Sequence, residues 1–307
     1  MNGWPDGARL REIRVQARAA AAVLRLPLGR QVWSGPAGGW TGPGRGASLE
    51  FQDHREYAPG DDPRHIDWQA YARSDAYTMK MYREEVSPST DLLLDASASM
   101  FLDARKCDRA LELFCFAALS AAAAGAAVRT FAVNGAGWQR LDPTLAAAPA
   151  LPPDGPLGAH VPSGLRPQTT VGPARAPALP ALPLRPGGLR VLVSDCLFPE
   201  PPEALLRALV APRSRGLVLA PFASAEAEPQ WEREMEMVDC ETGERRPQRV
   251  DGALLARYAA SYRRHFEGWR EACTRRRVAF ARLPPEGTLV DALRRAALPA
   301  GAVEPSR

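Results

Sequence analysis

Lysine is almost missing from this chain of 307 residues, because only Lys80 and Lys106 occur and arginine supplies nearly all the positive charge. The formal net charge of +4 is a mild excess. The first thirty residues hold six arginines against Asp6 and Glu12. Surfaces that bind nucleic acid are usually dense in both cations and follow one face of the molecule. Nucleic-acid binding is therefore kept as an alternative and is not the leading interpretation.

Cysteines are few, and no hydrophobic run is long. The five cysteines are odd in number and form no C-x-x-C pair, which argues against a disulfide framework and a structural zinc site. The longest low-charge stretch, residues 113–128, is rich in alanine and is expected to be a buried helix. The N-terminus carries acids and no uninterrupted apolar segment. We therefore expect a cytoplasmic protein without a signal peptide or a membrane span.

Motifs of several enzyme classes are also missing. The sequence has no P-loop, so ATP binding is not expected. An aspartyl-phosphate hydrolase needs a second acid two residues after its nucleophile, but Ser97 holds that position after Asp95. The G-x-S-x-G turn of serine hydrolases is absent, and the four histidines form no recognisable pattern. We expect no catalysis, with a cryptic metal-dependent hydrolase as an alternative.

What is present is an alternation of buried strands and amphipathic helices. Strands are predicted at 90–95, 128–133, 138–141, 189–195, 216–222 and 278–283, with a hairpin at 235–250 that turns at Thr242-Gly243. Helices are predicted at 106–122, 202–210, 253–276 and 287–296. This order is typical of an α/β fold with a doubly wound, mainly parallel sheet, as in Rossmann-like domains. An N-terminal extension, a helix at 7–26 and short extended pieces, precedes it.

The composition predicts two parts. Residues 1–87 hold the N-terminal helix and the extended pieces, and residues 88–300 hold the α/β domain. Inside this domain, residues 151–187 contain ten prolines, which is too many for regular structure. We expect a long surface loop there.

The predicted strand 90–95 ends in Asp95, and the chain continues as Ala-Ser97-Ala-Ser99. Alternate residues of a segment that leaves a strand face the same way, so the carboxylate and the two hydroxyls can converge. These are hard oxygen donors, which suit Mg²⁺, Mn²⁺ or Ca²⁺ and not zinc. The competing interpretation is that Asp95 and Ser97 cap the next helix.

A second acid, Asp195, ends the predicted strand 189–195. Ligands of open α/β sheets bind at the carboxyl edge, where both strand-terminal acids would lie. The proline-rich loop between the two strands carries a single threonine pair, Thr169-Thr170. The combination favours a divalent-cation site over a structural cap.

The order D-x-S-x-S, then Thr, then Asp resembles the metal-ion-dependent adhesion site of von Willebrand factor A domains. The resemblance implies Mg²⁺, or else Mn²⁺ or Ca²⁺, held by Asp95, Ser97, Ser99, Thr169 and Asp195. In that family the hydroxyls ligate the ion directly, and the acids act mainly through waters. Thr169 fits the spacing of the family better than Thr170, although Pro167-Gln168 replaces the usual glycines, so the third ligand stays open between the two threonines.

The stretch HREYAPGDDPRHIDW, from His54 to Trp68, carries a second resemblance. Its pattern R-E-Y-x-P-G-D-D-x-R-x-I-D-W, followed by D-A-S-A-S-M, resembles the bacterial domain-of-unknown-function-58 family. The match runs from about Gly46 to Met100 and continues more loosely over most of the chain. The signature residues are Arg55, Tyr57, Gly60, Asp61, Asp62, Arg64, Asp67, Trp68 and Arg73.

The family resemblance implies a function. Many members carry two N-terminal membrane helices, which this sequence lacks, so a soluble form is expected. Family genes often lie beside those of MoxR-type AAA+ ATPases, and members are thought to act as their adaptors. We therefore expect a metal-dependent protein-interaction module, an adaptor or co-chaperone of such an ATPase, whose bound ion accepts an acidic side chain of a partner.

For the signature stretch itself we expect mainly a clamp between the N-terminal segment and the metal-binding domain. Tyr57 and Trp68 would bury their rings, and Pro59-Gly60 would form a type II turn. The acids Asp61 and Asp62 would accept backbone N–H bonds or pair with nearby arginines. A partner-docking surface is the alternative, because exposed Arg and Trp favour interfaces. A second metal site is expected least.

Overall fold

The computed structural model describes residues 5–28, 32–36, 49–58, 63, 66–85, 89–135, 137–141, 175–177, 179–210, 214–231 and 233–306. The chain forms two compact units. The smaller is Gly29–Pro88, and the larger joins Met1–Leu28 to Ser89–Arg307.

The smaller unit is a three-stranded antiparallel sheet in the order β2-β4-β3. Its strands are β2 (Val32–Pro36), β3 (Leu49–Glu56) and β4 (Thr78–Glu85). A short helix, α2 (Trp68–Ser74), connects β3 to β4. Asp67 begins this helix by accepting hydrogen bonds from the backbone N–H groups of Gln69 and Ala70, which have no partner inside the helix.

The larger unit is built on a six-stranded sheet in the order β12-β9-β8-β5-β6-β7. All neighbours are parallel except the edge strand β7, which pairs antiparallel with β6. The prediction of an α/β fold with a mainly parallel sheet is confirmed. The strands are β5 (Ser89–Asp95), β6 (Ala127–Val133), β7 (Trp138–Leu141), β8 (Leu189–Val193), β9 (Arg215–Pro221) and β12 (Ala279–Leu283).

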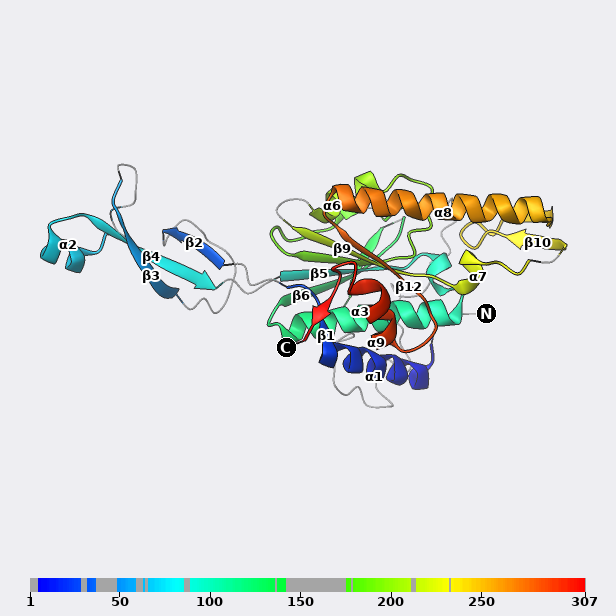
Figure 1. Cartoon of the computed structure of the whole chain (residues 1–307), viewed down its shortest axis with the longest axis horizontal. Helices are drawn as coiled ribbons and strands as arrows, with labels where there is room; N and C mark the ends of the chain where they lie inside the picture. Colours follow the sequence, from blue (N-terminus) through cyan, green and yellow to red (C-terminus); the bar gives the residue numbers. More distant parts are fainter. Residues whose placement is uncertain are drawn as a thin grey trace. The chain divides into compact units, whose positions relative to one another are not determined.

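Helices cover both faces of this sheet (Figure 1). Along the central strand β5, Leu92 and Leu94 enter one apolar core and Leu93 enters the other, so the strand is apolar at successive positions. The first core is closed by α1 (Gly7–Val23), α3 (Ala104–Ala123) and α9 (Leu289–Ala292), which continues into the π-helical turn η5 (Leu293–Ala297). The second is closed by η4 (Leu179–Ala181), α6 (Glu203–Val210) and α8 (Gly252–Arg275).

The first helix belongs to the larger unit, which corrects the expected boundary of residues 1–87. Ile13, Ala17 and Ala20 are buried against the sheet's first core, and alanines allow α1 to pack closely on α3. The next residues, β1 (Leu24–Arg25), pair with β13 (Glu304–Pro305) near the C-terminus. An amphipathic helix is stabilised by burying its apolar stripe, and α1 does so against α3, where Arg9 pairs with Asp108 across 99 residues of sequence.

Three short elements stand near the carboxyl edge of the sheet. They are η2 (Ala98–Phe101), α7 (Ser224–Ala227) and the antiparallel hairpin β10 (Glu234–Val238) and β11 (Arg245–Arg249). The hairpin was predicted, and Gly243 stands in its turn with a φ of 71°. Glycine adopts this left-handed conformation without the steric cost of a Cβ.

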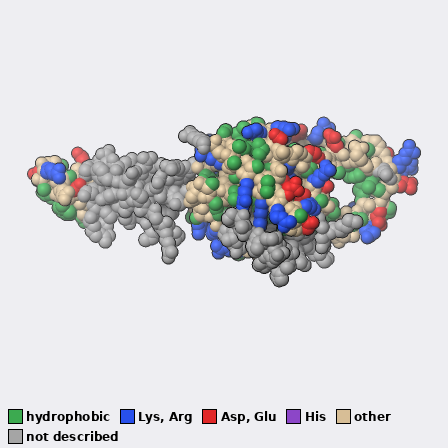
Figure 2. Space-filling view, turned by 90° about the horizontal axis from the view of Figure 1, so that it is seen from below, with side chains coloured by type: hydrophobic (Ala, Val, Ile, Leu, Met, Phe, Trp, Pro, Cys, Tyr) green, Lys and Arg blue, Asp and Glu red, His purple; other side chains and the backbone are tan. Residues whose placement is uncertain are grey.

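The face drawn in Figure 2 presents Lys and Arg side chains interspersed with Asp and Glu over the described part of the larger unit. Basic stripes that bind nucleic acid carry one sign of charge along a face. Among the described residues, no helix has the length and apolar character needed to cross a membrane.

Candidate metal site

The two strands that were expected to end at a site, β5 and β8, are direct neighbours at the centre of the sheet. After β5 the chain enters α3, which covers one face, whereas after β8 it enters α6, which covers the other. The connections therefore leave in opposite directions at this point of the sheet, and such a switch point opens a crevice at the carboxyl ends of the strands. The candidate site occupies that position.

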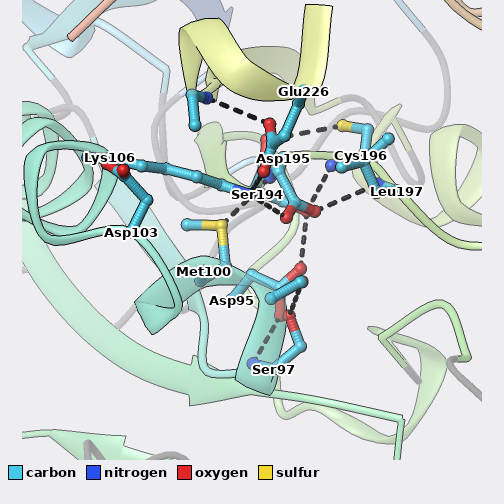
Figure 3. A network of polar contacts seen from close by, with 12 residues as sticks. Asp95, Ser97, Met100, Asp103, Lys106, Ser194, Asp195, Cys196, Leu197 and Glu226 are labelled. Carbon is cyan, nitrogen blue, oxygen red and sulfur yellow. Dashed lines mark hydrogen bonds and ion pairs between the residues drawn. The ribbon is translucent and has the colours of Figure 1, made fainter. Parts of the chain in front are cut away.

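Asp95 and Ser97 meet at the end of β5 (Figure 3), and the Ser99 hydroxyl lies beside that of Ser97. The Oδ1 atom of Asp95 accepts a hydrogen bond of 2.9 Å from the backbone N–H of Ser97. The hydroxyl oxygens of Ser97 and Ser99 lie 3.2 Å apart. The Oδ2 atom of Asp95 accepts a bond of 2.6 Å from the hydroxyl of Ser194. One carboxylate and two hydroxyls thus gather in a single turn of chain.

The capping interpretation does not hold for the following α-helix. The cap of α3 is Asp103, whose Oδ1 accepts a bond of 2.8 Å from the backbone N–H of Lys106. Ser97 precedes the short 3₁₀ turn η2 but makes no side-chain cap bond. The Asp95 carboxylate closes an Asx turn on Ser97, and its second oxygen is turned to Ser194.

Asp195 lies at the same edge of the sheet, just after β8, and a buried lysine holds it. The Nζ atom of Lys106, from α3, lies 2.6 Å from Oδ2 of Asp195 and 2.5 Å from Oε1 of Glu226 in α7. The lysine side chain is fully buried, and that of Asp195 is 2 % exposed. The other oxygen of Asp195 accepts the backbone N–H of Leu197 at 3.0 Å. Asp195 is therefore fixed at both oxygens (Figure 3).

The backbone after β8 adds to this fixation. Cys196 adopts a φ of 59°, a conformation that residues with a Cβ rarely take. The Nε2 atom of His265, from α8, lies 2.7 Å from the Cys196 carbonyl oxygen. Strained backbone of this kind persists where surrounding contacts hold it, and it often lies beside functional groups. Here it turns the chain sharply next to Asp195.

The two acids at the strand ends, Asp95 and Asp195, differ in their electrostatic surroundings. Burial, followed by the negative charge of Asp195, raises the pKa of Asp95 to about 6. Burial alone would lower the pKa of Lys106, but the charges of Asp195 and Glu226 outweigh it, so this pKa is raised and the ammonium stays charged. Among the described residues no Lys or Arg forms an ion pair with Asp95. A divalent cation would supply the missing positive charge.

A further acid enters from the β10–β11 hairpin. The Oε1 atom of Glu241 accepts a hydrogen bond of 3.0 Å from the backbone N–H of Ser99, and the residue is only 8 % exposed. Four carboxylates and one ammonium thus gather at this edge of the sheet: Asp95, Asp195, Glu226 and Glu241 with Lys106. This excess of negative charge favours a cation.

The donors present fit a hard divalent ion. Hydroxyl and carboxylate oxygens are the ligands that Mg²⁺ and Ca²⁺ prefer. Within the described ranges no group of three or more His, Cys, Asp and Glu side chains is arranged to hold a metal, so a site here depends on Ser97 and Ser99. The expected third ligand, Thr169, and its neighbour Thr170 lie outside the described residues.

Sequence reasoning missed Lys106, Ser194, Glu226 and Glu241 as parts of the site. Lys106 did carry a signal, because it is one of two lysines in the chain and stands next to Cys107 on the buried face of α3. Charged residues on such a face need a partner. Its partners Asp195 and Glu226 are 89 and 120 residues away, so the sequence around Lys106 does not reveal them.

The signature residues of the smaller unit are described only in part. Gly60, Asp61, Asp62 and Arg64 lie outside the described residues, as does the expected Pro-Gly turn. Asp67 caps α2, Arg73 is exposed in its last turn, and the Arg55 guanidinium donates to the Glu56 carbonyl at 3.1 Å.

The expected burial of Trp68 is wrong, because the residue is 59 % exposed. As the first residue of α2 it packs edge-on against Tyr71 and Tyr77 at centroid distances of 6.1 and 6.5 Å. Tyr57 is half-buried and meets the edge of Tyr77. The aromatic residues thus contact one another, and Trp68 stays largely exposed.

Comparisons with known proteins give the family. No curated protein of similar sequence is found. A crystal structure titled as an aerotolerance-related membrane protein from Bacteroides fragilis NCTC 9343 with multiple mutations to serines is similar at 14 % identity and a TM-score of 0.32, covering 61 % of this chain and 100 % of that one. The family described as "Protein of unknown function DUF58" matches residues 53–268, which is more than half of the chain. The chain therefore belongs to the DUF58 family.

Proposed function

We propose that this DUF58 protein is a divalent-cation-dependent protein-interaction module that serves a MoxR-type AAA+ ATPase as an adaptor or co-chaperone. The observation that supports the proposal most is the gathering of the Asp95 carboxylate and the Ser97 and Ser99 hydroxyls at the switch point of the sheet. D-x-S-x-S resembles the adhesion site of von Willebrand factor A domains, and this resemblance points to a metal ion as the ligand of the gathered oxygens. The ATPase partner follows from family resemblance.

In this proposal the chain's own residues have distinct roles. Ser97 and Ser99 hold the ion through their hydroxyls, and Asp95 orients the serine turn through its bond to the Ser97 N–H. Asp195 supplies negative charge at a position fixed by Lys106. A bound Mg²⁺ supplies a centre that accepts a carboxylate oxygen of a partner. Recognition would then combine one charged contact with the shape of the surrounding surface.

Calorimetry with Mg²⁺ and Mn²⁺ tests the cation site. We expect one site in the wild-type protein and no binding in Asp95→Asn, which keeps the shape of the side chain and removes its charge. Asp75→Asn is the matched control, because Asp75 is exposed in the smaller unit and lies in the left-handed region, which asparagine tolerates. Unchanged binding in Asp95→Asn would refute the site.

The third ligand is decided by the same measurement on two further variants. Thr169→Val and Thr170→Val each remove one hydroxyl at nearly constant volume. We expect Thr169→Val to weaken binding, with Thr170→Val close to wild type. The reverse result would assign Thr170 in its place.

The partner is tested by co-purification with the MoxR-type ATPase of the same genome. We expect a complex in native mass spectrometry with nucleotide and Mg²⁺ that is lost with EDTA and in Asp95→Asn. Absence of any complex under these conditions would count against the adaptor proposal. Titration with a DNA duplex at several salt concentrations tests the nucleic-acid alternative, since phosphate contacts make affinity fall steeply with salt.

A further inference from the structure

The tip of the β10–β11 hairpin differs from its arms. The arms consist of exposed and half-buried residues, and Val238 is 51 % exposed. At the tip, Glu241 is only 8 % exposed although it carries a carboxylate. Burial of an ionised carboxylate is costly unless specific partners compensate it. The hairpin therefore places the Glu241 carboxylate at a defined position.

The tip is shaped to hold this acid in place. The Oδ1 atom of Asp239 accepts the backbone N–H groups of Glu241 and Thr242 at 2.8 and 3.1 Å. Gly243 closes the turn in the left-handed region. The Glu241 carboxylate then meets the backbone N–H of Ser99 at 3.0 Å, directly at the proposed ligand turn.

Among the described residues, this contact is also the one hydrogen bond that joins the hairpin to the rest of the chain. Across the described chain, the other hydrogen bonds and ion pairs of residues 234–249 stay inside the hairpin. Arg245 pairs with Glu236 and Arg246 with Glu244, all on exposed side chains. Such pairs stiffen the hairpin but do not attach it to the sheet. Among these polar contacts, the Glu241–Ser99 bond is therefore the one that joins the tip to the site.

We propose that the β10–β11 hairpin is a lid on the cation site, whose Glu241 carboxylate holds the place beside Ser99 that a partner's Asp or Glu would take. The inference rests on the proposed function and adds its regulation. Partner and lid offer the same chemical group to the same turn, so they exclude each other. A partner binds by shifting the hairpin from a closed to an open population.

Mn²⁺ in place of Mg²⁺ makes the lid measurable, because the relaxation of water protons reports how many waters reach the bound ion. In Glu241→Ala we expect a Mn²⁺ affinity lower by roughly 10-fold and a higher relaxation rate per bound ion. Acetate, the probe for a partner carboxylate, should lower that rate in Glu241→Ala at concentrations without effect on wild type. Glu241→Gln, which keeps the shape of the side chain, should change in the same direction.

The matched control is Glu244→Ala, which removes the same charge from the same hairpin at an exposed residue. It should behave like wild type. Without metal, hydrogen exchange at the Ser99 amide should be faster in Glu241→Ala than in wild type or Glu244→Ala, because only the first loses its acceptor.

The outcomes separate the two proposals. If the wild-type protein binds no Mn²⁺, the proposed function falls and the lid falls with it. If wild type binds Mn²⁺ and Asp95→Asn does not, while Glu241→Ala matches wild type in relaxation and acetate response, the lid alone is overturned. Faster exchange at Ser99 together with an acetate response limited to the Glu241 variants supports it.

Discussion

The Nζ atom of Lys106 lies 2.6 Å from Oδ2 of Asp195 in a place that solvent does not reach, with the lysine side chain fully buried. A buried ammonium of this kind is tolerated because Asp195 and Glu226 both compensate it. The pair joins α3 to the end of β8 across 89 residues of sequence. It therefore links the stability of the fold to the position of a proposed site residue.

Replacement of Lys106 by methionine should be strongly destabilising. The variant leaves the buried Asp195 carboxylate without its counter-charge, and removal of one partner of a buried pair costs roughly 3–5 kcal/mol of the free energy of unfolding. Urea denaturation followed by circular dichroism measures this loss. If Lys106→Met unfolds at the same urea concentration as the wild-type protein, the buried ion pair does not contribute to stability as the structure implies.

The double variant Lys106→Met with Asp195→Asn is the control for that measurement. When both charges are removed, Asp195 no longer leaves a buried charge without its partner, while Glu226 still loses the lysine, so part of the lost stability should return. If the stability lost in the double variant equals the sum of the losses in the two single variants, Lys106 and Asp195 are not energetically coupled.

Glu112, on α3, should make stability depend on pH. Burial, partly opposed by Arg109 at 2.8 Å, raises the pKa of Glu112 to about 7 from an ordinary value of 4.5. The folded state thus holds the proton more tightly than the unfolded chain. Its stabilising contribution is complete below pH 4.5 and is lost as pH rises through about 7. The free energy of unfolding should therefore fall between pH 5 and pH 8.

Glu112→Gln should flatten this part of the pH profile, because its side chain stays neutral at every pH. Each pKa unit of difference corresponds to roughly 1.4 kcal/mol, so the change lies within reach of chemical denaturation at several pH values. Glu271→Gln is the matched control, since Glu271 is exposed on α8. A profile of Glu112→Gln parallel to wild type would show that this proton is not involved.

Asp91 should matter for the fold and not for the cation site. It is buried inside β5, where its two oxygens accept Nε and Nη2 of Arg129, each at 2.8 Å. Asp91→Asn breaks this two-bonded pair and should lower the free energy of unfolding by several kcal/mol, on the order of 3–5. Its Mg²⁺ affinity, measured where the variant is still folded, should match wild type. A loss of Mg²⁺ binding with intact stability would reverse these roles.

Local pattern was enough for most of the fold. The predicted strand 128–133 differs from the observed one by one residue at its start, and the predicted helix 253–276 by one residue at each end, because buried apolar runs and amphipathic stripes are encoded locally. The neighbourhood of Asp95 and Asp195 followed from the rule that parallel strands end at one edge. These features need no knowledge of distant partners.

Other features depend on contacts that no local pattern records. The helix α1 packs on α3, where Arg9 meets Asp108 across 99 residues, and Arg25 pairs with Glu304 across 279. Glu241 meets Ser99 across 142 residues. Trp68 is a core residue by type, yet it is 59 % exposed and packs edge-on against Tyr71 and Tyr77. Polar partners and exposure are set by tertiary packing, which residue type alone does not specify.

The cap of α2 gives the last test, within the smaller unit. Asp67 is buried and accepts the backbone N–H groups of Gln69 and Ala70 at 3.0 and 3.2 Å. Asp67→Ala leaves these groups without an acceptor, which typically costs about 1 kcal/mol. The amides of residues 69–74 should exchange faster, and thermal unfolding of this unit should begin at a lower temperature. Asp67→Ser, which keeps a capping oxygen, should recover most of the protection. If alanine and serine at position 67 protect the helix equally, Asp67 acts there through something other than its cap.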